Sequence, residues 1–346
     1  MNMIAITIIQ INLHHLPATS LAIAFLSCFL FSCNPAAKKS LPESSLQPAE
    51  KDIPNFNADS ACQYTRQQVD FGPRVPNTPA HVACGDYFVR TLKRFGANVT
   101  EQKVILQNYA GTRLNARNII ASYQPENINR ILLFAHWDTR PFADHDPNPE
   151  NWRIPIDGAN DGAGGCGVLL EIARQLQIKQ PDIGVDLILF DAEDWGAPLF
   201  ENNIPHPENS YCLGSAYWAT NPHTPNYNAR YGILLDMVGA PDATFYKERY
   251  SIRYASRILN KVWETAQSAG FGRYFIQAEG GFIEDDHVQV IKHRNIPCID
   301  IIHLDPDGDT GFGHYWHTLH DSMDNISKET LYAVGQTLLL VIYNEK

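Results

Sequence analysis

Residues 185–194 read VDLILFDAED, a short and mostly apolar run that ends abruptly in three carboxylates. An apolar run of this length, bounded by polar residues, is typical of a strand buried on both faces of a parallel sheet. Similar runs occur at 131–136, 232–237 and 297–302, and segments of helical period lie at 168–176, 253–268, 286–293 and 328–343. The alternation predicts an α/β fold, a three-layer sandwich with a mixed, mostly parallel central sheet flanked by helices.

The segment before these runs predicts two helices and two strands. One helix is expected over 58–69, and a second begins after Thr78 as cap with Pro79 in its first turn and stops at Gly96. Strands are expected over 98–107 and 115–123. Ser327 is the expected cap of the last helix. Because neither a second linker nor a repeat follows residue 54, we expect one catalytic domain over 54–346.

Length and charge exclude several classes of protein. The chain has 346 residues, 44% of them hydrophobic and 19% charged, which is ordinary for a globular protein and excludes a disordered or coiled-coil chain. Its formal net charge is -11 and it has no basic run, so nucleic acid is not an expected partner.

The first 33 residues contain no Asp, Glu, Lys or Arg, and an apolar run over 21–32 leads to Leu30-Phe31-Ser32-Cys33. This segment predicts an export signal, and its end resembles a bacterial lipobox. We therefore expect a periplasmic protein that is held at the membrane only by lipid on Cys33, with 34–53 as a tether. A misplaced start codon and an uncleaved anchor are the alternatives.

Five of the seven cysteines lie in the expected domain, without any CxxC spacing, which excludes a zinc finger. An oxidising compartment would permit one disulfide, with Cys62 and Cys84 as candidates, although the sequence cannot establish it.

Ionisable residues follow the apolar runs at their carboxyl ends. The carboxyl ends of parallel strands meet at one edge of a sheet, where open α/β sheets bind ligands. With Asp161 before a helix and His317 in a loop, they form an Asp/Glu/His set of the kind that binds zinc. The residues at the run ends are His136, Asp138, Asp191, Glu193, Asp194, Asp236 and Asp300.

Each member also has an ordinary structural interpretation. Asp161 could cap the following helix, Glu193 and Asp194 could form a solvated turn, and His317 could be a loop histidine. His136 could be a satisfied core residue. A GxGxxG match at 162–167 does not directly follow a strand, so it does not predict a dinucleotide site. Incomplete calcium-loop patterns at 144–148 and 305–309 make calcium a minor hypothesis.

Several motifs in the same order resemble the zinc-dependent aminopeptidase superfamily and, within it, the animal-type glutaminyl-peptide cyclotransferases. The resemblance extends from about residue 71 to the C-terminus. Its markers are Phe71-Gly72-Pro73-Arg74, His136-Trp137-Asp138, Gly158-Ala159-Asn160-Asp161, Phe190-Asp191-Ala192-Glu193-Asp194, Leu234-Leu235-Asp236-Met237-Val238-Gly239-Ala240-Pro241, Asp285-Asp286-His287 and Trp316-His317-Thr318.

The resemblance implies a role for each matching residue. Asp161, Asp194 and His317 correspond to the three ligands of a single zinc, and Glu193 to the general base and acid. Asp236 and Asp285 correspond to acids hydrogen-bonded near that base. Asp300 stands where the animal enzymes have a histidine and is counted among the candidate residues of the substrate pocket. Trp195, Trp316 and Phe312 are the candidate walls of the substrate pocket.

The implied activity is zinc-assisted cyclisation of the N-terminal glutamine of a peptide or protein to pyroglutamate, with release of ammonia, by a monomeric enzyme. The alternative is a two-zinc aminopeptidase in which His136 and Asp236 complete a second site and Asp161 bridges. A third possibility is a lipoprotein that only binds peptides at a relic metal site.

Overall fold

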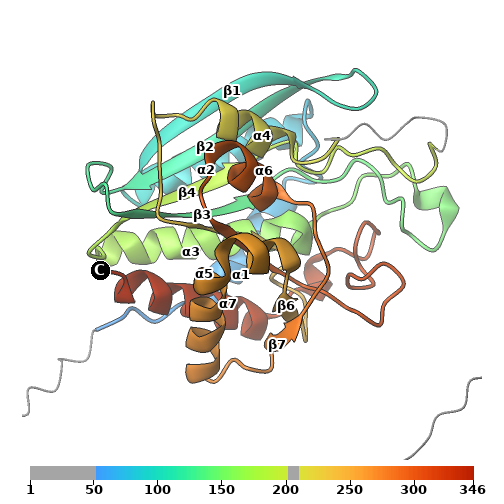
Figure 1. Ribbon diagram of the computed structural model, residues 1–346. Coiled ribbons are helices and arrows are strands. Elements are labelled where there is room, and N and C mark those ends of the chain that lie inside the picture. Colours follow the sequence, from blue (N-terminus) through green and yellow to red (C-terminus); the bar gives the residue numbers. More distant parts are fainter. Residues whose placement is uncertain (1–51, 202–209) are drawn as a thin grey trace, which may run out of the picture. The chain divides into compact units, whose positions relative to one another are not determined.

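The four apolar runs form four neighbouring parallel strands of a six-stranded sheet, from its middle to one edge. The computed structural model describes residues 52–201 and 210–346, and the strand order is β1-β2-β4-β3-β5-β8 (Figure 1). The parallel strands are β3 (Arg130–His136), β4 (Gly184–Phe190), β5 (Gly232–Asp236) and β8 (Cys298–Ile302). At the other edge, β2 (Arg113–Tyr123) pairs antiparallel with β4, and β1 (Asn98–Gln107) pairs antiparallel with β2.

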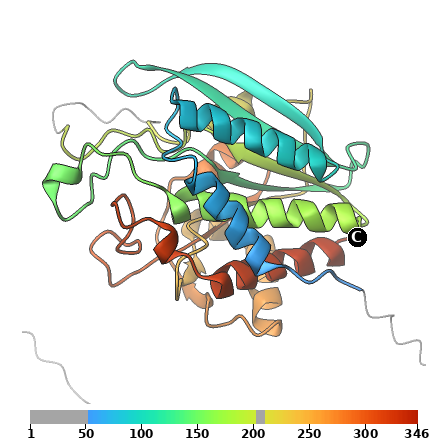
Figure 2. The same ribbon diagram turned by 180° about the vertical axis from the view of Figure 1, so that it is seen from behind.

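Helices cover both faces of this sheet. One face carries α1 (Ala58–Val69), α2 (Pro79–Arg94), α3 (Gly165–Ile178), α5 (Arg249–Ser268) and α7 (Lys328–Asn344), of which α1, α2, α3 and α7 lie in front in Figure 2. The other face carries α4 (Leu213–Thr220) and α6 (Asp286–Arg294), which pack on each other. The expected three-layer α/β sandwich is therefore confirmed.

Smaller elements complete the unit over Glu50–Lys346. Two short parallel strands, β6 (Phe245–Lys247) and β7 (Phe275–Glu279), form a second sheet. The 3-10 turns are η1 (Pro149–Asn151) and η3 (Met323–Asn325), and η2 (Ala159–Gly164) is an irregular turn directly before α3.

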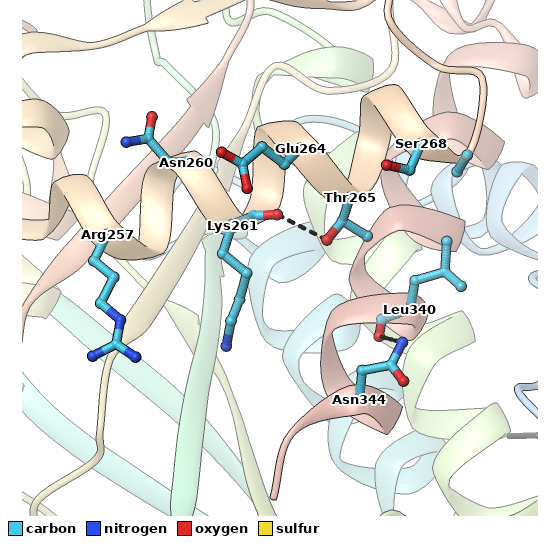
Figure 3. Close-up of a pocket in the computed structure, with 9 residues that line it drawn as sticks. Arg257, Asn260, Lys261, Glu264, Thr265, Ser268, Leu340 and Asn344 are labelled. Carbon is cyan, nitrogen blue, oxygen red and sulfur yellow. Dashed lines mark hydrogen bonds between the residues drawn. The ribbon is translucent and has the colours of Figure 1, made fainter. Parts of the chain in front are cut away.

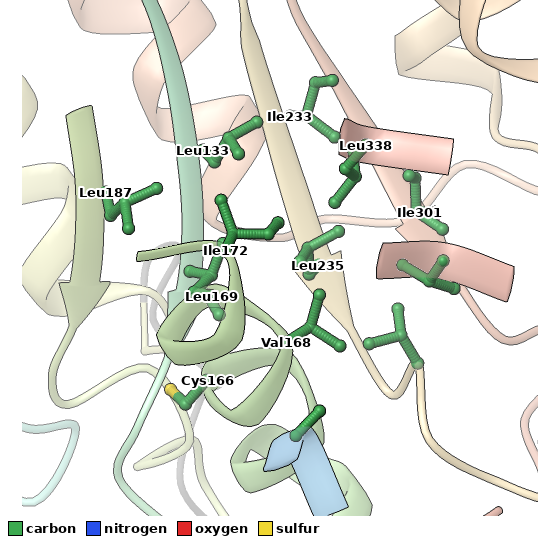
Figure 4. Close-up of a cluster of buried hydrophobic side chains, with 14 of the residues drawn as sticks. Leu133, Cys166, Val168, Leu169, Ile172, Leu187, Ile233, Leu235, Ile301 and Leu338 are labelled. Atoms are coloured by element: carbon green, nitrogen blue, oxygen red, sulfur yellow. The ribbon is translucent and has the colours of Figure 1, made fainter. Parts of the chain in front are cut away.

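The central strands bury side chains on both faces, which is why they read as nearly continuous apolar runs. Leu133 on β3 belongs to the core cluster that contains Ile172 of α3 and Leu338 of α7 (Figure 4). Its neighbour Phe134 belongs to the cluster on the opposite face, with Trp218 of α4. All five side chains are fully buried, and shortening a residue such as Leu133 to Ala typically costs about 2–5 kcal/mol.

The sequence located most elements to within a few residues, and the expected caps are present. The Thr78 side chain accepts from the His81 amide, and that of Ser327 accepts from the Thr330 amide. The elements α4, β6 and β7 were not predicted. Residues 213–220 read LGSAYWAT and have no clear helical period, because this short helix is apolar around much of its circumference and packs between the sheet and α6.

The candidate disulfide between Cys62 and Cys84 is wrong. All five cysteines of the described residues are free, and Cys84 lies fully buried in the core while Cys62 is only partly buried. The predicted export signal, the lipid on Cys33 and all but the last two residues of the tether lie outside the described residues. Within the part of the chain that the structure describes, no helix has the length and apolarity needed to cross a membrane.

Candidate active site

The three predicted metal ligands meet at the carboxyl edge of the sheet. Asp161 comes from η2, Asp194 from the turn after β4, and His317 from the loop between β8 and α7. The His317 Nε2 atom lies 3.3 Å from Asp194 Oδ1 and 3.8 Å from Asp161 Oδ2. One ligand atom from each side chain lies within 4.8 Å of the others, so a single ion could contact all three.

The chemistry of this group fits zinc. All three side chains are buried, and both Asp194 Oδ2 and His317 Nδ1 lack a hydrogen-bond partner. Burial, and then the charge of Asp161, raises the pKa of Asp194 well above its ordinary value, so these two carboxylates need a nearby cation to be charged together. Burial also lowers the pKa of His317, which keeps its imidazole neutral, as a metal ligand must be. Two oxygens and one nitrogen leave a fourth position open, as in catalytic zinc sites.

Asp321 fixes the two loops that carry Asp161 and His317. This fully buried carboxylate accepts from the amides of Asn160 at 2.7 Å and Asp161 at 3.0 Å, and it lies four residues after His317. Burial, followed by the charge of Asp161, raises its pKa to about 8. Asp321 therefore joins two segments that are far apart in the sequence.

Arg140 fixes the third ligand. Its buried guanidinium forms two bonds to Asp144, at 2.6 and 2.7 Å, and its Nη1 lies 3.3 Å from the main-chain oxygen of Asp194 and 3.4 Å from Asp194 Oδ1. Because Asp144 is paired with Arg140 and Asp146 accepts from the backbone amides of Asn148 and Leu319, both carboxylates of the first calcium-like stretch have structural partners.

Glu193, the predicted base, lies next to this group on a turn that Asp138 holds. The two carboxylate oxygens of Asp138 accept from the amides of Glu193 at 3.0 Å and Asp194 at 3.2 Å. Glu193 is partly exposed, and its Oε1 lies 3.1 Å from the sulfur of Cys212. Burial raises the pKa of Glu193 well above its ordinary value, as a proton acceptor working near neutral pH requires.

His136 links the group of three candidate zinc ligands to Asp236. Its Nε2 lies 2.9 Å from Asp161 Oδ1 and 3.3 Å from Asp236 Oδ1. Burial alone would lower the pKa of His136, but bonds with Asp138, Asp161 and Asp236 together raise it well above its ordinary value. The same three side chains form a second group with metal-ligand spacing, as the aminopeptidase alternative requires.

The remaining acids form a buried cluster beside Glu193. Asp285 caps α6 and has a carboxylate oxygen within 4.8 Å of ligand-type atoms of Glu193 and Cys212. Burial raises the pKa of Asp285 and Asp300, and the carboxylate of Asp236 adds to the effect on both. Asp300 is fully buried, 3.8 Å from His287 Nδ1, and its predicted place in the substrate pocket stays a prediction.

Two of the three candidate wall residues lie beside the metal group. The Trp316 ring stacks on the His317 ring with centroids 3.8 Å apart, and Phe312 lies 4.7 Å from Trp316. Trp195 instead packs against the small apolar cluster of β1 and β2 and against the Phe142 ring, and its indole nitrogen is buried without a partner. Its role as a pocket wall stays a prediction.

Sequence reasoning missed Arg140, Asp321 and Cys212 as parts of this site. Asp138 was recognised at the end of its strand run and in a motif, but its hydrogen bonds with the amides of Glu193 and Asp194 were not predicted. A pocket of about 740 Å³ between α5 and α7, lined by residues such as Arg257 and Lys261, contains none of the candidate site residues (Figure 3). Lys261 is joined to Glu345, which bonds Tyr231 directly before β5, so this pocket lies at the amino edge of the sheet, opposite the candidate site.

Comparison with known proteins relates the chain to enzymes of one superfamily. Residues 118–342 match the model of peptidase family M28. A glutaminyl cyclase from Tannerella forsythia is 57% identical, with a TM-score of 0.83 over 85% of this chain and 100% of its own. A Zn-dependent exopeptidase from Parabacteroides distasonis is 59% identical, with a TM-score of 0.83 and the same two coverages. A glutaminyl-peptide cyclotransferase from Drosophila melanogaster is 29% identical over 87% of this chain and 86% of its own.

Proposed function

This chain belongs to peptidase family M28, and from that premise we propose that it is a glutaminyl-peptide cyclotransferase, which converts an N-terminal glutamine of peptides or proteins to pyroglutamate and releases ammonia. The observation that carries the proposal is the position of Glu193. It places a partly exposed proton acceptor on the residue before Asp194, beside the three-ligand group.

The reaction needs little beyond folding of the substrate and movement of one proton. The α-amine of the glutamine attacks its own γ-carboxamide carbon, a carbon–nitrogen bond forms, and the bond to the amide nitrogen breaks. Glu193 takes the proton from the attacking amine and gives it to the departing nitrogen, which leaves as ammonia. Such general acid–base catalysis typically contributes about 10²- to 10⁴-fold, and because both reacting groups belong to one residue, the pocket only has to hold it in the folded conformation.

Asp161, Asp194 and His317 would hold one zinc ion, which when bound supplies Lewis-acid polarisation of the γ-carbonyl oxygen. The Trp316 ring stacks on His317, the Phe312 ring lies against Trp316, and the two rings would enclose the folded glutamine side chain and exclude water from it. Hydrogen bonds with Asp138, Arg140 and Asp321 hold the backbone that carries the base and the candidate ligands in place.

The contacts of His136 support a site with one metal. Its Nε2 lies 2.9 Å from Asp161 Oδ1, so one hydrogen bond can occupy this nitrogen without a second ion, whereas Asp236 Oδ1, 3.3 Å away, has no hydrogen-bond partner. The same three residues are the observation that favours the second candidate, a two-zinc aminopeptidase. From the N-terminal segment we further propose an exported, periplasmic protein anchored by lipid on Cys33.

One experiment separates the two functions. The purified protein is incubated with a peptide that begins with glutamine and with one that begins with leucine, both are followed by mass spectrometry, and zinc is counted per chain. Loss of ammonia from the first peptide, an intact second peptide and one zinc are expected. Released leucine with two zincs would overturn the proposal and assign His136 and Asp236 to a second metal.

A further inference from the structure

We propose that Cys212 is a positioning residue for the reaction: its thiol donates a hydrogen bond to Glu193 and holds the carboxylate of the base in its working orientation. This inference rests on the proposed function, because it takes Glu193 as the base. Cys212 touches neither the three-ligand group nor the reacting atoms in this assignment, so it acts through Glu193 alone.

The side-chain contact is short and its direction is fixed. The Cys212 sulfur lies 3.1 Å from Glu193 Oε1, and the Cys212 residue is only 2% exposed. The thiol S–H is the donor of this bond and the carboxylate oxygen is the acceptor. With Oε1 held by the thiol, the second carboxylate oxygen is the one available to take the proton from the substrate amine.

Backbone hydrogen bonds and a left-handed turn place the Cys212 thiol at this position. The Cys212 amide donates to the main-chain oxygen of Glu193 at 2.9 Å, and the Leu213 amide donates to that of Ala192 at 3.1 Å. Cys212 and Ala192 both have a left-handed backbone, with φ of 57° and 56°. A left-handed conformation is unfavourable for a residue with a side chain, so the surrounding packing must maintain it at these two facing positions.

Close packing keeps the two segments together. A Cβ atom on Gly214 would lie 2.0 Å from the main-chain oxygen of Asp191, so the start of α4 could not approach the turn after β4 with any larger residue. The backbone pairs therefore set the separation of the two segments, and the left-handed turn aims the Cys212 side chain at Glu193.

A thiol suits this position because it is a weak donor. It can restrict rotation of the carboxylate while leaving it basic enough to accept a proton. If the Cys212 sulfur served only to fill space, its S–H bond would need no particular direction. Ala would then replace Cys212 better than Ser, because Ser would bury a hydroxyl. A donor role predicts the opposite order, since Ser retains an O–H and Ala does not.

The test compares Cys212→Ala and Cys212→Ser, with Cys298→Ala and Cys298→Ser as matched controls. Cys298 is also a buried cysteine, and its thiol bonds the main-chain oxygen of Ile296 at 3.3 Å. We expect Cys212→Ala to lower kcat for the glutamine peptide about tenfold with an unchanged KM, since a small misplacement of a catalytic group is costly. Cys212→Ser should recover most of that loss, and the Cys298 variants should retain the wild-type kcat.

A spectroscopic measurement keeps the test independent of turnover. The infrared S–H stretching band of Cys212 is assigned in zinc-loaded wild-type protein by its loss in the Ser variant. We expect its frequency to lie below that of the Cys298 band and to shift upward in Glu193→Gln. Equal kcat in Cys212→Ala and wild type, Ala exceeding Ser, or a band insensitive to Glu193 would overturn the inference. Absence of cyclisation by the wild type would instead refute the proposed function, and the band position would still decide the contact.

Discussion

Replacing Asp138 with Asn tests whether this buried carboxylate holds the base and a metal ligand in register. Asp138 accepts from the amides of Glu193 at 3.0 Å and Asp194 at 3.2 Å, and it is fully buried. Asn keeps one carbonyl oxygen, so one of the two bonds is retained and the other is replaced by an amide group facing an N–H donor.

The magnitude follows from the bond that is lost. A hydrogen bond to a charged group contributes about 1.5–3 kcal/mol, so we expect the free energy of unfolding to fall by about 2–3 kcal/mol. Displacement of Glu193 should be more costly for turnover than for stability, because a shift of about 1 Å in a catalytic group can lower the rate about 10²-fold. Zinc affinity should fall about 10- to 100-fold, as for other residues that orient a metal ligand.

The matched control is Asp186→Asn. Asp186 is a fully buried aspartate on β4 that bonds Arg130 and Tyr227 at the opposite end of the strand from the site. Both variants should lose comparable stability in denaturant unfolding, but only Asp138→Asn should lose kcat, followed as ammonia release, and zinc affinity, followed by metal titration. If the two variants lose kcat equally, or if Asp138→Asn keeps wild-type kcat and zinc affinity, the positioning role assigned to Asp138 is refuted.

Three further predictions concern the base, the metal and a buried histidine. Glu193→Gln should keep the fold and the zinc content but lower kcat about 10²- to 10⁴-fold, because an amide cannot take the proton; near-normal turnover would remove Glu193 from the mechanism. Removing zinc with a chelator should lower the Tm, because Asp161 and Asp194 lose the cation between them. Adding zinc at a hundredfold excess over its Kd should raise the free energy of unfolding by about 2.7 kcal/mol. An unchanged Tm would argue against these ligands. Burial lowers the pKa of His303 from 6.5 to about 4, so between these pH values the unfolded chain binds a proton that the folded chain does not, and stability falls as the pH falls. Between pH 7 and pH 5, the free energy of unfolding should fall by about 2 kcal/mol less in His303→Gln than in wild type. Equal decreases in the two proteins would contradict this assignment.

Most of the helices and strands could be predicted from the sequence. The runs at 131–136 and 185–190 are β3 and β4 to within one residue, because a parallel strand covered on both faces has to be apolar at nearly every position. The helix over 58–69 and the strand over 98–107 agree with α1 and β1. Helix α4 was missed for the complementary reason, since this short helix also carries apolar residues on its partly exposed face and so has no period to detect.

The sequence by itself also placed the strand-end groups together, because residues at the carboxyl ends of parallel strands share one edge of the sheet, and the resemblance of its motifs added Asp161 and His317. What holds them there was decided only by the tertiary structure. Asp321 bonds the backbone of Asn160 across 161 positions of sequence, and Cys212 bonds Glu193 across 19. The partners of Asp321 are backbone amides, which every residue except proline carries, and the aim of the Cys212 thiol depends on a left-handed turn. Neither feature leaves a pattern along the chain, so the candidate ligands could be named from the sequence and the residues that support them could not.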